Sequence, residues 1–268
     1  MNIGLVLSGG GVRGVGHIGV IKALEEHNII PTHIAGTSAG AVVGALYAYG
    51  YNWEDMISFF KKIQFFDLKK YAVNKPGFID AEKFYDLFKE YLIVDNFNSL
   101  KKKLHITATD ILKGKLEIFS KGELIKPLIA SAAFPGVFAP VKINDSYYID
   151  GGALNNFPVE VLKTHCDKII GAYANGFKII NINDLKHSLN VLERALKIMS
   201  VRDDYLKFSD CDLVIHPKNL SSYGTFDKKN IDTIFKLGYD SASRVLENLT
   251  LQNKKEFTTK DKSNYVLQ

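Results

Sequence analysis

A serine flanked by glycines two positions to either side is the strongest candidate in this sequence for covalent chemistry. The stretch Gly36-Thr37-Ser38-Ala39-Gly40 fits the pattern G-x-S-x-G, where a short apolar strand is expected to pass into an Ala- and Val-rich helix. In that context a tight turn exposes the serine hydroxyl as a nucleophile, and the flanking glycines avoid clashes with neighbouring elements. Alone, the five residues also fit an ordinary helix start with Ser38 near its cap.

A run of glycines follows the first apolar stretch of the chain. The segment Ser8-Gly9-Gly10-Gly11-Val12-Arg13-Gly14 lies between an expected strand and an expected helix, so successive amides can face one point at a helix N-terminus. Such a loop favours an anion, which in acyl transfer would be the oxyanion of the tetrahedral intermediate, held by Gly9, Gly10 and Gly11. Arg13 is expected either to add positive charge there or to clamp the loop to the sheet.

The same loop allows a second interpretation. Gly9, Gly11 and Gly14 satisfy the G-x-G-x-x-G pattern of dinucleotide-binding loops. That fingerprint normally has an acidic residue about twenty positions further on, which binds the ribose. Here the corresponding region reads Ile34-Ala35-Gly36-Thr37 and contains no carboxylate, so the sequence disfavours a nucleotide cofactor.

A carboxylate lies at the end of another apolar stretch. In Tyr147-Tyr148-Ile149-Asp150-Gly151-Gly152, Asp150 ends an expected strand, and Gly151 and Gly152 form the turn that follows it. A carboxylate with an ordinary pKa of about 4 is a poor base for a serine hydroxyl, so burial would have to raise that pKa. Without the other motifs, Asp150 would be interpreted as part of a common Asp-Gly turn.

Together, these motifs resemble the patatin-like phospholipase family in residue type, order and approximate spacing. The segment Ser131-Ala132-Ala133-Phe134-Pro135-Gly136-Val137-Phe138 is similar to the one before the family's aspartate turn, and the likeness covers roughly residues 1–161. The resemblance implies a Ser-Asp dyad without histidine, in which Ser38 attacks an ester carbonyl and Asp150 takes its proton. It also implies that the glycine-loop amides bind the oxyanion and that water then releases the fatty acid.

Other reactive side chains lack such a context. His17 lies early in an expected helix, and the remaining histidines fall at the ends of elements or look structural. No cluster of His, Asp or Glu has the spacing of metal ligands. We therefore expect no catalytic histidine, no metal and no other cofactor.

The motifs require alternating strands and helices to position them. The chain shows this alternation, which predicts an α/β fold with a mostly parallel central sheet flanked by helices on both faces. The expected strands are residues 3–7, 33–35, 104–109, 116–119, 147–149, 168–173 and 213–215, and the expected helices are residues 14–27, 39–49, 123–133, 158–164, 190–207 and 228–246.

The same pattern suggests how the chain is divided. We expect a single catalytic domain over residues 1–250 and a polar C-terminal tail over residues 251–268. Residues 51–103 interrupt the alternation and are expected to form a helical insertion or cap with two amphipathic helices. Their aromatic residues would either cover one end of the core or form a lid or groove for an acyl chain.

Composition limits the partners and the location. A net charge of +5 predicts mild attraction to anionic surfaces, with basic runs at Lys69-Lys70 and Lys101-Lys102-Lys103, but the sequence has no nucleic-acid-binding motif. It also has no leader pattern and no apolar stretch long enough to span a bilayer, and its two cysteines match no zinc or redox spacing. We therefore expect a cytoplasmic protein with peripheral membrane contact and no nucleic-acid partner. The sequence carries no indication of the oligomeric state.

The expected function is hydrolysis of carboxylic esters in phospholipids or lysophospholipids, a substrate class that the resemblance implies. One alternative is a binding or regulatory protein that keeps the fold with little catalysis, although all the site motifs are intact. Another is hydrolysis or transfer of small acyl thioesters, because the family's fold resembles that of acyl-carrier-protein transacylases. Those enzymes generally pair the serine with histidine.

Overall fold

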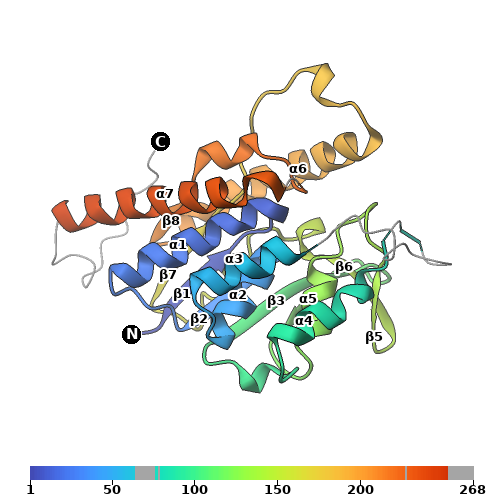
Figure 1. Ribbon diagram of the computed structural model, residues 1–268, viewed down its shortest axis with the longest axis horizontal. Coiled ribbons are helices and arrows are strands. Elements are labelled where there is room, and N and C mark those ends of the chain that lie inside the picture. The colour runs from blue at the N-terminus through green and yellow to red at the C-terminus, as the bar shows by residue number, and fades with distance from the viewer. Residues whose placement is uncertain (64–75, 78, 227, 253–268) are drawn as a thin grey trace.

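The strands that the structure describes form one sheet (Figure 1). The computed structural model describes residues 1–63, 76–77, 79–226 and 228–252. Within these residues the eight-stranded sheet has the order β5-β6-β3-β2-β1-β7-β8, with β4 paired to β3. The strands are β1 (Ile3–Leu7), β2 (His33–Thr37), β3 (Lys103–Asp110), β4 (Lys115–Phe119), β5 (Val141–Ile143), β6 (Ser146–Asp150), β7 (Lys168–Ala172) and β8 (Leu213–Ile215). The α-helices are α1 (Val15–Glu26), α2 (Ala39–Tyr49), α3 (Trp53–Lys62), α4 (Tyr85–Tyr91), α5 (Ile125–Ser131), α6 (Ser188–Leu206) and α7 (Ile231–Gln252).

The sheet has a parallel part and an antiparallel part. Strands β3, β2, β1, β7 and β8 are parallel neighbours, whereas β4, β5 and β6 pair antiparallel. The predicted α/β fold with a mostly parallel central sheet is therefore confirmed. The sequence did not predict β5, because its three residues, Val141–Ile143, are too few for an alternating pattern to indicate a strand.

The two faces of the sheet are covered differently. On β1, Leu5 and Leu7 belong to the larger core, while Val6 belongs to a smaller core on the opposite face. The larger core lies beneath helices that include α1, α2 and α7, and Figure 1 shows α7 lying alongside α1. The smaller core is covered mainly by two short 3-10 helices, Val159–Val161 and Lys207–Asp210.

One predicted helix has a different form. We expected an α-helix over residues 158–164, but the structure has only the 3-10 helix Val159–Val161 followed by turns. Phe157, Val159 and Val161 all pack into the smaller core. A spacing of two residues matches neither the α-helical repeat of 3.6 nor the 3-10 repeat of 3.0, so an irregular turn buries these side chains where a regular helix could not.

The segment 51–103 contains the two expected helices, α3 and α4. The Phe59 ring is buried against the rings of Phe88 and Tyr91, which covers one end of the core. Phe60 and Phe88 also line the cavity described below. The described aromatic residues of this segment therefore belong both to the core cover and to a cavity wall.

Several predictions from composition concern the surface. Lys102 is half-buried and donates a hydrogen bond to the carbonyl oxygen of Pro31 (3.0 Å), so this lysine is partly structural. Lys69-Lys70 and most of the expected tail, residues 253–268, lie outside the described residues. In the part of the chain that the structure describes, no helix combines the length and apolar character needed to cross a bilayer.

Candidate active site

Ser38 occupies a sharp turn between β2 and α2. Its φ of 54° lies in the left-handed region, which is uncommon for a residue other than glycine. A Cβ added to Gly36 would lie 2.7 Å from the Ala41 backbone, and one added to Gly40 would overlap the carbonyl oxygen of Leu7. Glycines on both sides of Ser38 thus allow α2 to start directly against the sheet.

Strand register brings Ser38 and Asp150 together. Thr37, the last residue of β2, pairs with Thr107 of β3, and Asp150, the last residue of β6, pairs with the next β3 residue, Ala108. Strand β4 occupies the other edge of β3 over the same stretch. Strands β2 and β6 therefore lie along one edge of β3 with their C-terminal ends facing each other, so Ser38 and Asp150 line the same cavity.

The junction between these strand ends is closely packed. The hydroxyls of Thr37 and Thr107 are 2.6 Å apart, and the Thr37 hydroxyl also donates to the carbonyl oxygen of Asn155 (3.0 Å). A Cβ added to Gly151 would lie 2.5 Å from the carbonyl oxygen of Thr107. Only glycine leaves room for the turn after Asp150 to approach β3 this closely.

Burial changes the acidity of Asp150. The side chain is buried, and desolvation raises the pKa of this carboxyl to about 6, although hydrogen bonds from the Gly152 amide (2.8 Å) and from Ser38 oppose the rise. At neutral pH the group is therefore mostly a carboxylate and is more basic than an exposed aspartate. This shift has the direction and cause that the sequence motifs require of a base for Ser38.

The amides of the glycine loop are not equivalent. The Gly9 amide donates to the carbonyl oxygen of Asn156 (3.1 Å) and is already engaged. The amides of Gly10 and Gly11 have no hydrogen-bond acceptor among the described residues. Gly11 has a φ of 58°, and the 3-10 helix Gly11–Gly14 begins there. Of the three amides expected from the sequence to hold an anion, the structure thus leaves those of Gly10 and Gly11 without an acceptor among the residues it describes, and Gly9 fastens the loop to the turn after β6.

Arg13 has the contacts of a clamp. Its guanidinium is buried and donates to the carbonyl oxygen of Tyr223 and to Oδ1 of Asn175, each at 3.0 Å. Glu193 lies 3.7 Å away as an ion-pair partner. Burial lowers the pKa of Arg13, and Glu193 opposes that shift. Of the two roles that the sequence left open for Arg13, these contacts favour fastening the glycine loop to later parts of the chain.

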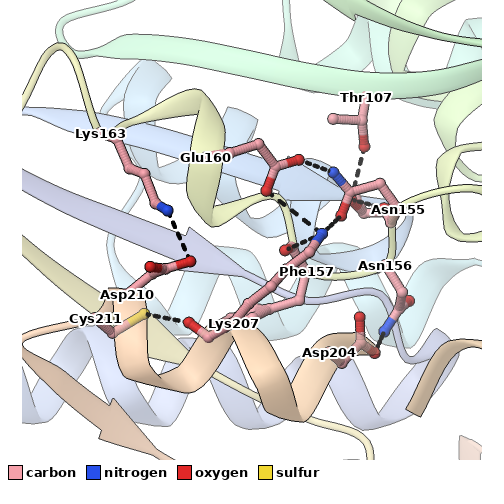
Figure 2. Close-up of polar contacts among 11 residues, drawn as sticks. Thr107, Asn155, Asn156, Phe157, Glu160, Lys163, Asp204, Lys207, Asp210 and Cys211 are labelled. Atoms are coloured by element: carbon pink, nitrogen blue, oxygen red, sulfur yellow. Dashed lines mark hydrogen bonds and ion pairs between the residues drawn. The ribbon is translucent and has the colours of Figure 1, made fainter. Parts of the chain in front are cut away.

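Asn156 and Asp204 support the site in a way that the motifs do not reveal. The Asn156 side chain donates to Oδ2 of Asp204 (3.0 Å), as Figure 2 shows, and the Tyr173 hydroxyl donates to the same oxygen (2.8 Å). Asp204 is only 2% exposed, and burial raises its pKa to about 6. Since the Asn156 carbonyl holds Gly9, a chain of hydrogen bonds links α6 to the glycine loop.

A second set of polar contacts, also visible in Figure 2, fastens the turn after β6 through Asn155, the residue before Asn156. Lys207 donates to Oδ1 of Asn155 (2.7 Å) and to the carbonyl oxygen of Phe157 (3.3 Å). Glu160 accepts a hydrogen bond from the Asn155 amide and lies 3.4 Å from Lys207. The only sequence signal for this arrangement is that Asn155 and Asn156 follow the Asp-Gly-Gly turn, because Asp204 and Lys207 are distant from them in sequence.

A cavity with about 1180 Å³ of space between its atoms, part of it open to solvent, contains Ser38 and Asp150. Its apolar wall comes mainly from the first half of the chain and includes Val42, Phe60, Ile63, Phe84, Phe88, Ile129 and Phe138. Its polar wall includes Arg13, Asn175, Glu193, Lys197 and Ser200. A long apolar group and a polar head could therefore be accommodated at the same time.

No histidine lines this cavity in the described part of the chain. His17 is buried with Nε2 2.8 Å from the carbonyl oxygen of Ser8, and burial lowers its pKa to about 4. The described residues also contain no group of three or more His, Cys, Asp or Glu side chains that could hold a metal ion. Asp150 is thus the ionisable side chain that contacts Ser38.

With this geometry established, the chain can be compared with known proteins. A family model described as patatin-like phospholipase matches residues 5–163, which is more than half of the chain. The chain belongs to the patatin-like phospholipase family. This confirms the resemblance seen in the motifs.

The curated relatives that the chain matches are longer than the chain itself. A lysophospholipase NTE1 of Kluyveromyces lactis is 27% identical over 94% of this chain, which covers 20% of that protein. An uncharacterised NTE family protein of Mycobacterium tuberculosis is 33% identical over 65% of this chain and 49% of its own length. This chain therefore spans at most about half of these curated relatives.

Solved structures show the same patatin-like fold. VipD from Legionella pneumophila matches 92% of this chain and 67% of its own with a TM-score of 0.60 at 18% identity. Human GIVD cytosolic phospholipase A2, solved with methyl gamma-linolenyl fluorophosphonate, matches 93% of this chain and 58% of its own with a TM-score of 0.51 at 10% identity. At these identities the likeness concerns the fold alone.

Proposed function

We propose that the chain hydrolyses carboxylic ester bonds in phospholipids or lysophospholipids. Ser38 is the nucleophile, Asp150 is the base, and the free amides of Gly10 and Gly11 bind the oxyanion. The observation that carries this proposal is the register on β3, which brings the buried carboxylate of Asp150 to the serine on the turn after β2.

The proposed reaction has two steps. In the first, Ser38 Oγ attacks the ester carbonyl while Asp150 takes its proton, and the tetrahedral intermediate collapses when that proton passes to the leaving alcohol. In the second, Asp150 takes a proton from water, the resulting hydroxide attacks the acyl-serine, and the proton returns to Ser38 as the fatty acid leaves. Loss of one oxyanion donor typically costs about 2.7–4 kcal/mol in the barrier, which gives the Gly10 and Gly11 amides a large role.

Two features of the cavity support a lipid with a charged head. The aromatic wall around Phe60, Phe84 and Phe88 suits an acyl chain. Lys197 lines the polar wall, where burial and the nearby positive charge of Arg13 lower its pKa to about 8. A lipid phosphate beside Lys197 would offset the positive charges of Lys197 and Arg13. The name lysophospholipase, carried by several relatives, agrees with such a substrate.

We place the reaction in the cytoplasm, at the surface of a membrane, within one catalytic domain over residues 1–250. Cys166 and Cys211 are both free thiols, as a reducing compartment requires. Peripheral contact would give the cavity access to lipids without a membrane-spanning helix.

The test combines covalent labelling with a substrate screen. A fluorophosphonate probe should label the wild-type chain but not Ser38→Ala. The control is Ser120→Ala, which replaces an exposed serine outside the cavity and should still be labelled. Lysophospholipid and phospholipid turnover should follow the same pattern. An unreactive wild-type chain would favour a binding or regulatory protein, and turnover of short acyl-CoA alone would favour a thioesterase or acyltransferase.

A further inference from the structure

Large apolar side chains are concentrated on the outside of one segment, residues 177–206. Ile179 is 95% exposed, Ile182 80% and Met199 70%. The exposed apolar residues of the segment are Phe177, Ile179, Ile182, Val191, Ile198, Met199, Tyr205 and Leu206. Figure 1 shows α6 and the loop before it projecting from the body of the molecule. Proteins rarely expose this much apolar surface in one place unless it binds a partner or a membrane.

Helix α6 has two faces with different roles. Val191, Ile198 and Leu206 are 7 and 8 positions apart, which places them on one face of an α-helix. Glu193, Leu196, Lys197 and Ser200 line the cavity from the opposite side of the same helix. The outer apolar face and the wall of the candidate active site are therefore two sides of a single element.

The charges around this face have an excess of positive sign. The exposed cations are Lys178, Lys186 and Arg202, and the exposed carboxylates are Asp184 and Asp203. In addition, the guanidinium of Arg194 lies 3.8 Å from the centre of the Phe177 ring. Lys178 and Lys186 lie in the loop before α6, and Arg202 lies on the outer face itself. An exposed apolar helix face with such an excess of cations suits the interface of a bilayer that contains anionic lipids.

We propose that residues 177–206 form a docking surface for an anionic lipid bilayer, with the outer face of α6 inserted among the headgroups and acyl chains. This inference rests on the proposed lipid-ester hydrolysis, because it explains why the exposed face and the cavity share one helix. A bilayer docked there lies next to the polar wall of the cavity.

The experiment measures binding to vesicles directly. Wild type and the double variant Ile198→Glu/Met199→Glu are floated with vesicles of phosphatidylcholine, with and without phosphatidylglycerol. A matched control is Ile111→Glu/Leu112→Glu, two residues of similar exposure (48% and 64%) in the turn between β3 and β4. The two glutamates remove apolar area that would enter the bilayer and add negative charge, so we expect the α6 variant to bind anionic vesicles at least about tenfold more weakly than wild type, while the control binds normally.

A soluble short-chain ester separates this inference from the proposed function. All three proteins should hydrolyse that ester at the same rate, and only the α6 variant should lose activity on lipid in vesicles. If wild type hydrolyses no ester yet floats with vesicles through α6, the proposed function fails and the docking surface stands. Equal vesicle binding by all three proteins would overturn the docking surface. It would also be overturned by a wild-type dimer that the α6 variant dissociates, without any vesicle binding.

Discussion

The two sides of the cavity are constructed in different ways. On the sheet side, Ser38, Asp150 and the glycine loop are held by strand register and by hydrogen bonds at buried positions. On the helix side, α6 carries polar groups inward and exposed apolar groups outward, and Asp204 fastens its last turn to Asn156. Under the proposed function, the rigid backbone of the sheet side would set the chemistry, and the peripheral helix α6 would determine access to lipid. Substitutions on the sheet side should therefore change turnover, and those on the outer face of α6 should leave the chemistry intact.

The largest effect is expected for Ser38→Ala. This change removes the proposed nucleophile, so hydrolysis of a soluble ester should fall by at least about 10⁴-fold, as for other enzymes that lose an acylated serine. The measurement is the initial rate on a chromogenic short-chain ester, with circular dichroism to check folding. A variant that keeps a substantial fraction of wild-type turnover would show that the reaction does not pass through this serine.

A slightly smaller loss is expected for Asp150→Asn. The amide keeps the shape but cannot accept the proton, so turnover should fall by about 10³-fold or more. In the wild type, kcat/KM should decline as pH falls below about 6, because the raised pKa of Asp150 sets where the base becomes protonated. A profile that stays flat to pH 5 would point to a different base.

The same substitution should stabilise the protein at neutral pH. Burial raises the pKa of Asp150 in the folded state above that of the unfolded chain, so the ionised carboxyl costs stability above pH 6. That cost, up to about 3 kcal/mol, disappears as pH falls towards about 4. Thermal unfolding of Asp150→Asn and wild type should therefore differ most at pH 8 and converge near pH 4. Equal stability at pH 8 would mean that the carboxyl is better solvated than the structure indicates.

A moderate effect is expected for Asp204→Asn. The substitution weakens the hydrogen bonds that orient Asn156 and, through it, the glycine loop, so kcat should fall about tenfold with little change in KM. The neighbouring exposed Asp203→Asn is the matched control and should behave as wild type. A change in KM alone would mean that Asp204 affects substrate access and not the orientation of the glycine loop. The contrast between the sheet side and the helix side of the cavity would then be weaker.

The smallest effect is expected for Ile179→Ser on the exposed segment. Because this side chain is 95% exposed, the free energy of unfolding should change by less than about 0.5 kcal/mol. The buried Ile170→Ala in β7 should lose about 2–5 kcal/mol. Chemical denaturation measures both. A marked loss for Ile179→Ser would mean that the segment packs against the body of the protein.

Much of the fold was predictable from local sequence. Strands β1, β2 and β3 and helices α1, α2 and α6 lie close to the predicted positions, because apolar periodicity and glycine turns are properties of neighbouring residues. The 3-10 helix Val159–Val161 was wrongly expected to be α-helical, since its form depends on how its side chains pack into the smaller core. The elements that non-local packing determines are the ones that sequence alone describes least well.

The candidate site follows the same rule. The turn glycines and the raised pKa of Asp150 could be predicted, because motif geometry and burial at a strand end suffice. Two hydrogen bonds could not be predicted: the one from the Gly9 amide to the Asn156 carbonyl oxygen, and the one from the Asn156 side chain to Asp204, 48 positions later. These contacts depend on how α6 folds back onto the turn after β6.

The end-to-end arrangement of β2 and β6 along β3 has a consequence for how such a chain can vary. The separation of the hydroxyl and the carboxyl is fixed by two consecutive residues of a third strand, Thr107 and Ala108, and not by the length of chain that joins them. Insertions or deletions between α2 and β3, or between β4 and β5, would leave that separation unchanged as long as the pairing persists. Relatives could therefore acquire caps of very different size while the reacting atoms stay the same distance apart.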